Sequence, residues 1–405
     1  MAMPRFRLTS ICFAGLALTL GGAHAATDLT FFLTSDVHYG NHTAANDTNR
    51  NRLPGYMNNL PGVAYPSSIG GTVATPRGLL IAGDLVERID TVYWNEYTSV
   101  YGISGEKKLK YPVFDAFGNH DFYTTGTIKD TLYGVRKMIE RNAPRRSYFT
   151  SMDSAGYHYS WDWDGVHFVN LNIYAGSSEL GYNGYRPLKA LEFLTEDLAK
   201  NVGTSGRPVI LFQHYTMDAN GNANNDWTNT MKSLVWNVVQ NYNIIAILHG
   251  HSHSKKMYKW NGIDVIDNGA AILGDMVVIK ITDGHFQAIS RSAAATATSQ
   301  TWSSTLILDK TISMGTPIST KAGRRNPYQN ILFTIPETGW NQMIPAGVKR
   351  LEVVDLRGER VRQLRAANGR VEWDRRDSKD RRVTAGIYWI REEGKTGSLG
   401  KVLLH

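Results

Sequence analysis

The segment Leu29-Thr30-Phe31-Phe32-Leu33-Thr34-Ser35-Asp36-Val37-His38 predicts both a fold class and a kind of chemistry. Its first six residues form a short apolar run of the length expected for a buried strand. The run then delivers Asp36 and His38, whose side chains are of the types that bind metal ions or transfer protons.

Four later apolar runs, at residues 78–82, 113–117, 208–212 and 244–248, end in the same way. The polar side chains that follow these runs are, in chain order, Asp84, then Asn119, His120 and Asp121, then His214, and finally His251 and His253. Of the 11 histidines that lie beyond residue 25, five occupy these strand-end positions.

The segments between these runs predict an α/β fold. Helical patterns cover residues 128–142, 187–201 and 227–241, and Asp164-Gly165 predicts a hairpin between strands at 158–163 and 167–171. In open α/β sheets, ligands gather beyond the carboxyl ends of the strands. We therefore expect the strand-end side chains to surround one cleft.

These residue types suit two hard or borderline divalent metal ions, because a carboxylate can bridge two ions while imidazole and amide groups complete each shell. Two ions about 3.5–4 Å apart clamp the attacking and leaving oxygens of a phosphoryl displacement and lower the pKa of bound water to about 7, which gives a hydroxide nucleophile. Gly83, Gly118 and Gly250 predict the sharp turns that expose the ligands.

The ordered series Asp36-Val37-His38, Gly83-Asp84, Gly118-Asn119-His120-Asp121, His214 and Gly250-His251-Ser252-His253 resembles the signature of the calcineurin-like metallophosphoesterases. The resemblance covers about residues 28–315 and implies a four-layer αββα sandwich. It implies that Asp36, His38 and His253 bind one metal, that Asn119, His214 and His251 bind the second, and that Asp84 bridges them. His120 would protonate the leaving group, oriented by Asp121, and the two ions would be Mn, Fe or Zn.

Two departures from the purple acid phosphatases narrow the resemblance. His38 stands where they have Gly, and Glu87 stands where they have a metal-bound tyrosine, so we expect no purple charge-transfer site. Its carboxylate would either hydrogen-bond a metal ligand or lie on the surface. Secreted 5'-nucleotidases add a large substrate-binding domain, whereas the C-terminal module here is short.

Three tyrosines close to the proposed ligands, Tyr39, Tyr123 and Tyr215, would contact the phosphate-ester substrate or else pack the rim of the cleft. The remaining histidines are expected to be structural or exposed: His42, His158, His167, His249 and His285. Residues 41–77, rich in Asn, Gly and Pro, would form a lid or a packed surface loop. Residues 292–305 predict a loose loop before a last strand at 304–308.

The first 25 residues predict a secretory signal peptide rather than a buried helix. Arg5 and Arg7 precede an apolar stretch at residues 11–20, and Ala23-His24-Ala25 has the pattern of a cleavage site. The single cysteine, Cys12, lies inside this segment, so the mature chain would have no disulfide and no thiolate ligand. We expect a secreted, surface-bound or periplasmic protein without a transmembrane segment.

The formal net charge of +8 comes from the C-terminal part. Residues 1–320 carry equal numbers of acidic and basic side chains, whereas residues 321–405 carry 18 Lys or Arg against 10 Asp or Glu. A nucleic-acid-binding protein would show its basic residues on the working domain, so no nucleic-acid-binding module is evident.

A linker at residues 316–326 would lead to a β-sandwich at 327–405. The segments Val353-Val354-Asp355-Leu356-Arg357-Gly358 and Ala385-Gly386-Ile387-Tyr388 resemble the Ig-like modules of flagellar-hook capping proteins and of type IX secretion sorting domains. The resemblance implies contact with secretion machinery or attachment at the cell surface. The basic residues would bind an anionic polysaccharide or lipid, or would form an ordinary solvated face.

The sequence thus predicts a secreted two-metal phosphohydrolase that cleaves phosphomonoesters or phosphodiesters with a metal-bound hydroxide. Two alternatives remain open at this point. One is a non-catalytic surface or adhesion protein on a phosphoesterase scaffold, and the other is a phosphodiesterase recruited to envelope lipids or polymers by its basic C-terminal module.

Overall fold

The structure of the chain is a computed structural model. It describes residues 27–124, 132–176, 189–217, 229–292, 300–315, 332–335, 340–343, 349–355, 359–367, 370–384, 386–394 and 398–404. The predicted signal peptide at residues 1–25 and the predicted linker at 316–326 lie outside these residues.

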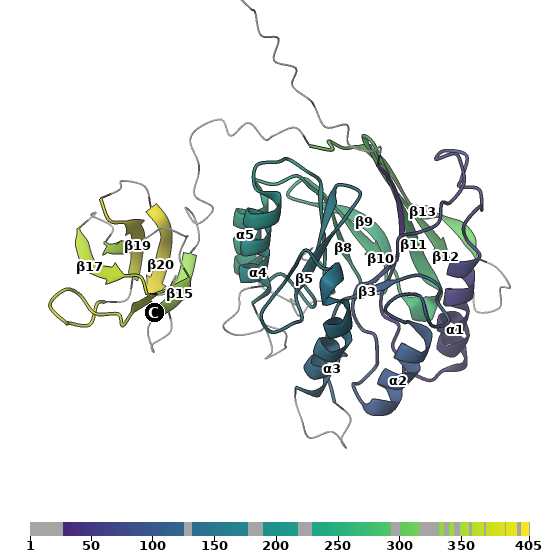
Figure 1. The fold of residues 1–405 in the computed structure, drawn as a ribbon, viewed down its shortest axis with the longest axis horizontal. Helices are drawn as coiled ribbons and strands as arrows, with labels where there is room; N and C mark the ends of the chain where they lie inside the picture. The colour runs from purple at the N-terminus through teal and green to yellow at the C-terminus, as the bar shows by residue number, and fades with distance from the viewer. Residues whose placement is uncertain are drawn as a thin grey trace, which may run out of the picture.

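Two large sheets form the main part of the fold (Figure 1). The first has six strands in the order β13-β12-β11-β1-β2-β3, with β1, β2 and β3 parallel and β11 antiparallel to β1. Its strands are β1 (Asp28–Thr34), β2 (Leu79–Ile81), β3 (Val113–Asp115), β11 (Asp275–Thr282), β12 (His285–Ser292) and β13 (Thr301–Thr311). The three parallel strands are the first three apolar runs of the sequence.

The second sheet has seven strands in the order β4-β5-β6-β7-β8-β10-β9. Its strands are β4 (Ser151–Met152), β5 (Tyr159–Trp163), β6 (Val166–Asn170), β7 (Val209–Phe212), β8 (Ile244–His249), β9 (Lys255–Trp260) and β10 (Ile263–Asn268). The predicted hairpin around Asp164-Gly165 is confirmed, because β5 pairs antiparallel with β6. The mixed α/β class is likewise confirmed.

The two sheets share one apolar core, because alternate residues of β1 point to opposite faces of its sheet. Phe31 joins a buried cluster that contains residues of both sheets, including Trp161 and Phe168. The rings of Phe31 and Phe168 are 5.3 Å apart, and those of Trp161 and Phe168 are stacked at 5.0 Å. Phe32, the next residue of β1, belongs instead to a cluster that includes helix residues. The sheets therefore pack against each other and are covered by helices.

Figure 1 places α4 and α5 on the opposite side of the sheets from α1 and α2. The helical segments are α1 (Ala44–Asn58), α2 (Thr91–Val100), α3 (Tyr133–Asn142), η1 (Ala143–Tyr148), α4 (Ala190–Asp197), the π-helical η3 (Leu198–Val202), α5 (Asn229–Val239) and η4 (Ala271–Leu273). The predicted helices at 128–142, 187–201 and 227–241 are confirmed by α3, by α4 with η3, and by α5, respectively. Their ends differ from the predicted bounds by a few residues, and the first residues of each predicted helix lie outside the described ones. Among the described residues, no helix has the length and apolar character needed to cross a membrane.

Residues 41–77 are a loop only in part, because α1 occupies residues 44–58, and the buried Leu60, Tyr65 and Val73 favour the packed alternative over a lid. The side chain of Thr43 caps this helix by accepting a hydrogen bond from the Asn46 backbone. Leu53 and Met57 are fully buried, so the helix is held by core packing although its composition favours turns. The sequence prediction failed here because the apolar positions are few and stand among Asn, Gly and Pro.

The strands at the end of the first sheet are longer than predicted. β12 continues to Ser292 and β13 already begins at Thr301, so the predicted loose loop at 292–305 is wrong at both ends. The prediction also missed β9 to β12. For β11 the signal was present, since residues 276–281 form an apolar run. β9 is an edge strand in which three of the six residues are Lys (Lys255, Lys256 and Lys259), which conceals the pattern of a strand.

The C-terminal part consists of strands only, as far as it is described. β14 (Leu332–Ile335), β16 (Arg350–Val354), β17 (Arg360–Arg365), β19 (Gly386–Glu392) and β20 (Ser398–Leu404) form one sheet, and β15 (Trp340–Met343) pairs with β18 (Arg370–Trp373). Its buried cluster includes Leu351, Val353 and Trp373 and contains no residue of the two large sheets. This part therefore has a core of its own.

A buried ion cluster fastens α2 and α3 to the end of β3. The carboxylate of Asp115 is fully buried and accepts hydrogen bonds from Arg141, Arg145 and the hydroxyl of Tyr97. Burial alone would raise the pKa of Asp115, but the charges of Arg141 and Arg145 lower it to about 2.

This pKa predicts a measurable loss of stability in acid. The ionised carboxylate contributes fully above about pH 4, its ordinary pKa in an unfolded chain, and the contribution disappears as the pH falls through about 2. Between pH 5 and pH 2 we expect wild-type protein to lose about 2 kcal/mol more than the Asp115→Asn variant in its free energy of unfolding by urea. Equal losses in the two proteins would contradict this account.

Candidate metal centre

The predicted strand-end residues come together at one place. Three groups of side chains have candidate ligand atoms that lie within 4.8 Å of one another: Asp36, His38 and His253; His38, Asp84 and His120; Asp84, His214 and His251. The first sheet supplies Asp36, His38, Asp84 and His120, whereas the last three histidines follow strands of the second sheet. The candidate metal centre therefore lies where the two sheets meet.

Asp84 occupies the middle of this arrangement. One carboxylate oxygen, Oδ1, accepts a hydrogen bond of 2.9 Å from the backbone N–H of His120. The other, Oδ2, lies 3.2 Å from His214 Nε2 and 3.6 Å from His38 Nε2. A single oxygen thus faces one histidine from each side, which is the position that a bridging ligand requires.

Asp36 presents one oxygen to two histidines on the first side of the centre. Its Oδ1 lies 3.2 Å from His253 Nε2 and 3.8 Å from His38 Nε2, and the two histidine nitrogens are 3.3 Å apart. Asp36 Oδ2 accepts hydrogen bonds from the Ser35 hydroxyl and from the His251 backbone, the latter at 3.0 Å. These bonds orient the carboxylate so that Oδ1 points into the centre.

His214 anchors the second side. Its Nδ1 lies 2.7 Å from the carbonyl oxygen of Ala82, so this nitrogen donates its hydrogen there and Nε2 is left to act as a ligand. Nε2 lies 3.1 Å from Asn119 Oδ1, and the His251 ring is 5.0 Å from the His214 ring. The three proposed ligands of this side, Asn119, His214 and His251, thus lie together beside Asp84.

The backbone at the centre is strained. Asp36, His38, Asp84, His251 and His253 all have φ between 48° and 72°, the left-handed region that residues with a side chain rarely adopt. Five of the seven proposed ligands share this conformation. Such strain costs on the order of 1–3 kcal/mol per residue and gathers at functional sites, where surrounding contacts enforce it.

Hydrogen bonds between the strand-end loops enforce this conformation. The backbone N–H of Asp36 donates to the carbonyl of Gly83 at 2.9 Å, and those of Val37 and His38 both donate to the carbonyl of Asp84, at 2.8 and 3.0 Å. The loops after β1 and β2 therefore hold each other in place.

Close approach explains two of the predicted glycines. A Cβ on Gly118 would lie 2.2 Å from the backbone nitrogen of Asp84 and from its Oδ1. Gly83 has a φ of +88°, and a Cβ there would lie 2.5 Å from His214 Nδ1. Both positions lack room for any side chain because a candidate ligand fills the space.

Charge shifts the pKa values of the candidate ligands. Burial raises the pKa of Asp36, but contacts with His253 and His38 outweigh burial and hold it well below its usual value. Burial lowers the pKa of His38, but Asp36 and Glu87 outweigh it and raise the pKa to about 10. Burial also opposes a charge on His214, while Asp84 raises its pKa to about 9. Groups that attract protons this strongly also attract divalent cations, which compete for the same atoms.

The donor set fits divalent metal ions. Carboxylate oxygens, imidazole nitrogens and one amide oxygen are the ligands that Mn, Fe and Zn share. In addition, Asp36 Oδ1 is buried and accepts no hydrogen bond from the described residues. Such an atom is costly to bury unless it has a partner, and a cation would supply one.

Comparison with known proteins agrees with this geometry. Residues 29–255, more than half of the chain, match the family described as calcineurin-like phosphoesterase (Metallophos). The chain belongs to the calcineurin-like phosphoesterases. It is therefore a metallophosphoesterase, a hydrolase that acts on phosphate esters. A comparison with curated proteins finds no match.

The phosphoesterase is also similar to solved structures of low sequence identity. One is a dimetal phosphatase from Danio rerio, with 13% identity, 71% of this chain and 99% of that chain covered, and a TM-score of 0.43. Another is GAP50 of Plasmodium, the anchor in the inner membrane complex. It is 12% identical, the match covers 72% of this chain and 90% of that chain, and the TM-score is 0.44. A third is phosphopantetheinyl hydrolase from Mycobacterium tuberculosis. It is 14% identical, the match covers 60% of this chain and 90% of that chain, and the TM-score is 0.32.

In this phosphoesterase, the Asp121 carboxylate, expected from the sequence to orient His120, makes its hydrogen bonds with backbone groups. The Asp121 carboxylate accepts hydrogen bonds from the backbone N–H groups of Gly118, Leu85 and Val86 at 2.8–3.0 Å. It is buried beside Asp84, and burial together with that charge raises its pKa to about 7. Asp121 therefore ties the loop after β3 to the loop after β2.

Glu87 contacts both His120 and His38. Its backbone carbonyl accepts a hydrogen bond of 2.9 Å from His120 Nδ1, and its carboxylate oxygen Oε2 lies 2.9 Å from His38 Nδ1. Contact with His38 is the main cause that lowers the pKa of Glu87. Of the two alternatives for this residue, the structure thus supports contact with a metal ligand over a free surface acid.

The three tyrosines near the ligands lie in different surroundings. Tyr39 and Tyr215 are 5% and 3% exposed, and Tyr215 packs its ring 4.7 Å from that of His251. These two positions favour the packing alternative. Tyr123 is 37% exposed, with its ring 5.6 Å from that of His120, so it stays the best placed of the three to meet a substrate.

The remaining histidines have structural or exposed positions. His158 and His249 are buried and hydrogen-bonded to Asn172 and to the Tyr258 hydroxyl, and His167 lies between Asp162 and Asp197. His42 and His285 are about half exposed. Sequence analysis missed Ser35 and Arg50, which contact Asp36 and the His38 backbone. Ser35 could have been found from its position beside Asp36, whereas Arg50 carries no local signal.

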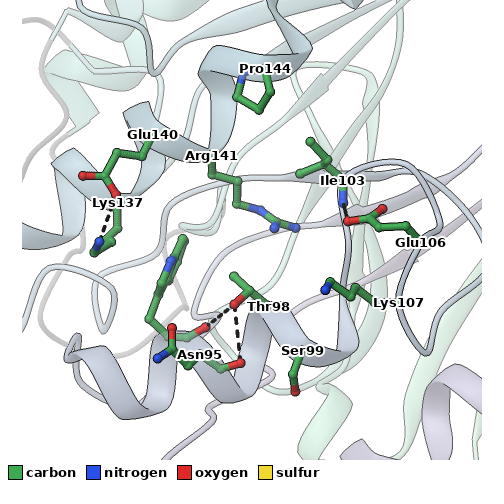
Figure 2. Close-up of a pocket in the computed structure, with 11 residues that line it drawn as sticks. Asn95, Thr98, Ser99, Ile103, Glu106, Lys107, Lys137, Glu140, Arg141 and Pro144 are labelled. Atoms are coloured by element: carbon green, nitrogen blue, oxygen red, sulfur yellow. Dashed lines mark hydrogen bonds and ion pairs between the residues drawn. The ribbon is translucent and has the colours of Figure 1, made fainter.

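A cavity of about 510 Å³ between α2 and α3 is not part of the centre (Figure 2). Several of its charged groups are already paired: Lys137 with Glu140 at 2.9 Å, Arg141 with Asp115, and Glu106 with the backbone of Ile103 and Ser104. It contains none of the candidate ligands, so the chemistry lies elsewhere.

Gly118→Ala tests the close packing around Asp84. We expect the affinity for Mn²⁺ to fall by roughly tenfold or more, because the new methyl group would collide with the backbone nitrogen and the carboxylate of Asp84, a candidate ligand. The measurement is a titration of metal-free protein with Mn²⁺. Gly55→Ala in α1 is the control, since no atom lies within 4 Å of its added Cβ. Equal affinities of the two variants would contradict the packing argument.

Proposed function

We propose that this calcineurin-like phosphoesterase is an exported enzyme that holds two metal ions and hydrolyses phosphomonoesters or phosphodiesters. The observation that carries the proposal is the position of Asp84 Oδ2, which faces His214 on one side and His38 on the other. Asp84 belongs to two of the three candidate ligand groups. The two stacked sheets with outer helices are what a four-layer αββα sandwich requires.

Two bound ions would polarise the phosphate ester and activate a water molecule for attack on phosphorus. The chain would hold them with Asp36, His38 and His253 on one side and with Asn119, His214 and His251 on the other. Their identity remains one of Mn, Fe or Zn, because this donor set suits all three.

His120 is the proton donor in this proposal. It donates from Nδ1 to the Glu87 carbonyl, so its other ring nitrogen carries the transferable proton when the imidazole is charged. Its side chain is 30% exposed and its ring is 4.7 Å from that of His38, which places it at the open edge of the centre. From there it can protonate the leaving oxygen as the ester bond breaks.

Asp84→Asn tests the mechanism. Replacing the shared carboxylate removes the negative charge between the two ligand groups, so we expect both metal content and the hydrolysis of an aryl phosphate or an aryl phosphodiester to fall to background. Metal content is measured by elemental analysis and hydrolysis by the release of the coloured phenol. Asp197→Asn, an equally buried carboxylate in contact with His167, is the control and should retain both properties.

Hydrolysis at the wild-type rate by the Asp84→Asn variant would contradict the mechanism. A wild-type protein that stays free of metal after reconstitution would instead favour the non-catalytic surface or adhesion scaffold. The intact set of seven candidate ligands argues against that alternative, because a scaffold without catalysis has no need for the strained ligand loops.

For the C-terminal part we propose an Ig-like module that attaches the enzyme to secretion machinery or to an anionic component of the cell envelope. Its separate buried cluster and its all-strand composition support a module of this kind. Its excess of basic residues supports an anionic partner, and β17 carries Arg360, Arg362 and Arg365. Part of this charge is neutralised locally, since Glu352 pairs with Arg360 and Arg391.

Deletion of residues 321–405 tests the attachment. We expect the truncated enzyme to hydrolyse a soluble aryl phosphate at an unchanged rate while a smaller fraction of its activity stays with the cells. The two fractions are compared by assaying washed cells and medium. Unchanged retention would contradict an attachment role, and loss of turnover would show that the module contributes to the site.

A further inference from the structure

Helix α1 carries a buried cation, Arg50, that contacts the backbone of the candidate ligand His38. Arg50 is fully buried, and its guanidinium donates hydrogen bonds to the backbone carbonyl of His38 and to the carboxylate of Asp47. Its central carbon also lies 5.0 Å from the centre of the Tyr39 ring. Burying a guanidinium costs several kcal/mol unless its partners are well placed, so this arrangement requires an explanation.

The partners of Arg50 lie mainly in the loop that carries His38. Besides the His38 carbonyl and the Tyr39 ring, its second terminal nitrogen lies 3.3 Å from His42 Nδ1. The His38 carbonyl also accepts a hydrogen bond of 3.0 Å from the Asn41 N–H. Both acceptor positions of this oxygen are therefore used, and the plane of the peptide bond after His38 is held on two sides.

That peptide plane matters because His38 is strained. Its φ of 48° is unfavourable for a residue with a side chain, so the conformation persists only where contacts enforce it. The same backbone conformation directs the imidazole toward Asp36, Asp84 and His253. His38 belongs to two of the three candidate ligand groups, so a change in its position would affect the whole centre.

We propose that Arg50 is a positioning residue, which holds the backbone of His38 in its left-handed conformation and so presents the imidazole to the metal. The inference rests on the proposed function. Arg50 does not act by attracting the metal, since a positive charge beside a cation site repels the ion, and Asp47 offsets that charge at close range. Its contribution is the hydrogen bond to the His38 carbonyl.

The test compares Arg50→Met and Arg50→Lys with matched variants of Arg145. Arg145 is also buried, and its guanidinium donates to the carbonyl of Val113 and to Asp115, away from the candidate ligands. Mn²⁺ affinity is measured by electron paramagnetic resonance of the free ion, and thermal unfolding is followed by circular dichroism.

We expect Arg50→Met to weaken Mn²⁺ binding by roughly tenfold or more, in the range seen when groups that orient metal ligands are removed. Arg50→Lys should recover part of the loss, because an ammonium can still donate to the His38 carbonyl. Both Arg145 variants should lower the unfolding temperature and leave Mn²⁺ affinity unchanged.

Wild-type affinity in Arg50→Met, or tighter binding after removal of the charge, would overturn this role. So would an equal loss of affinity in Arg145→Met, since destabilisation alone would then explain the effect. If Arg50→Met does not fold, the comparison of Arg50→Lys with Arg145→Lys decides. A lower Mn²⁺ affinity in Arg50→Lys alone supports the positioning role, whereas wild-type Mn²⁺ affinity in both variants overturns it. A wild-type protein that binds no Mn²⁺ would contradict the proposed function itself, and this role with it.

Discussion

The carboxylate of Asp84 is the group on which the rest of the centre depends. One of its oxygens is held by the backbone of the loop after β3, and the other faces His38 and His214. Its backbone carbonyl accepts two hydrogen bonds from the loop after β1. A single residue thus joins the ends of three strands, and its left-handed conformation follows from satisfying all of these contacts at once.

The distances in the centre are set by the packing of two sheets. Asp36, His38 and Asp84 follow strands of one sheet, whereas His214, His251 and His253 follow strands of the other. The aromatic core between the sheets, with Phe31 against Phe168, determines how far apart these groups of ligands lie. Because close-packed interiors resist deformation, the sheets can hold several strained ligand loops in one geometry.

Much of the site could be predicted from the sequence because its signals are local. A buried strand and the residue that follows it are neighbours in the chain, so five apolar runs were enough to find Asp36, Asp84, Asn119 and the histidines of the centre. The helix at residues 44–58 could not be found this way. Its stability comes from burying Leu53 and Met57 in the core and from the contact of Asn49 with the distant Ile272 carbonyl, and these outweigh a composition that favours turns.

The sequence by itself determined which donor atoms are available, which strand ends carry them, and that the chain has no cysteine other than Cys12. Only the tertiary structure decided which groups orient these donors. Asp121 accepts hydrogen bonds from backbone N–H groups, and the Glu87 carbonyl accepts one from His120. Arg50, twelve residues after His38 and within α1, donates to the His38 carbonyl. The physical reason is that a hydrogen-bond partner is chosen by distance and direction in space, and these are known only once the two sheets and α1 have packed together.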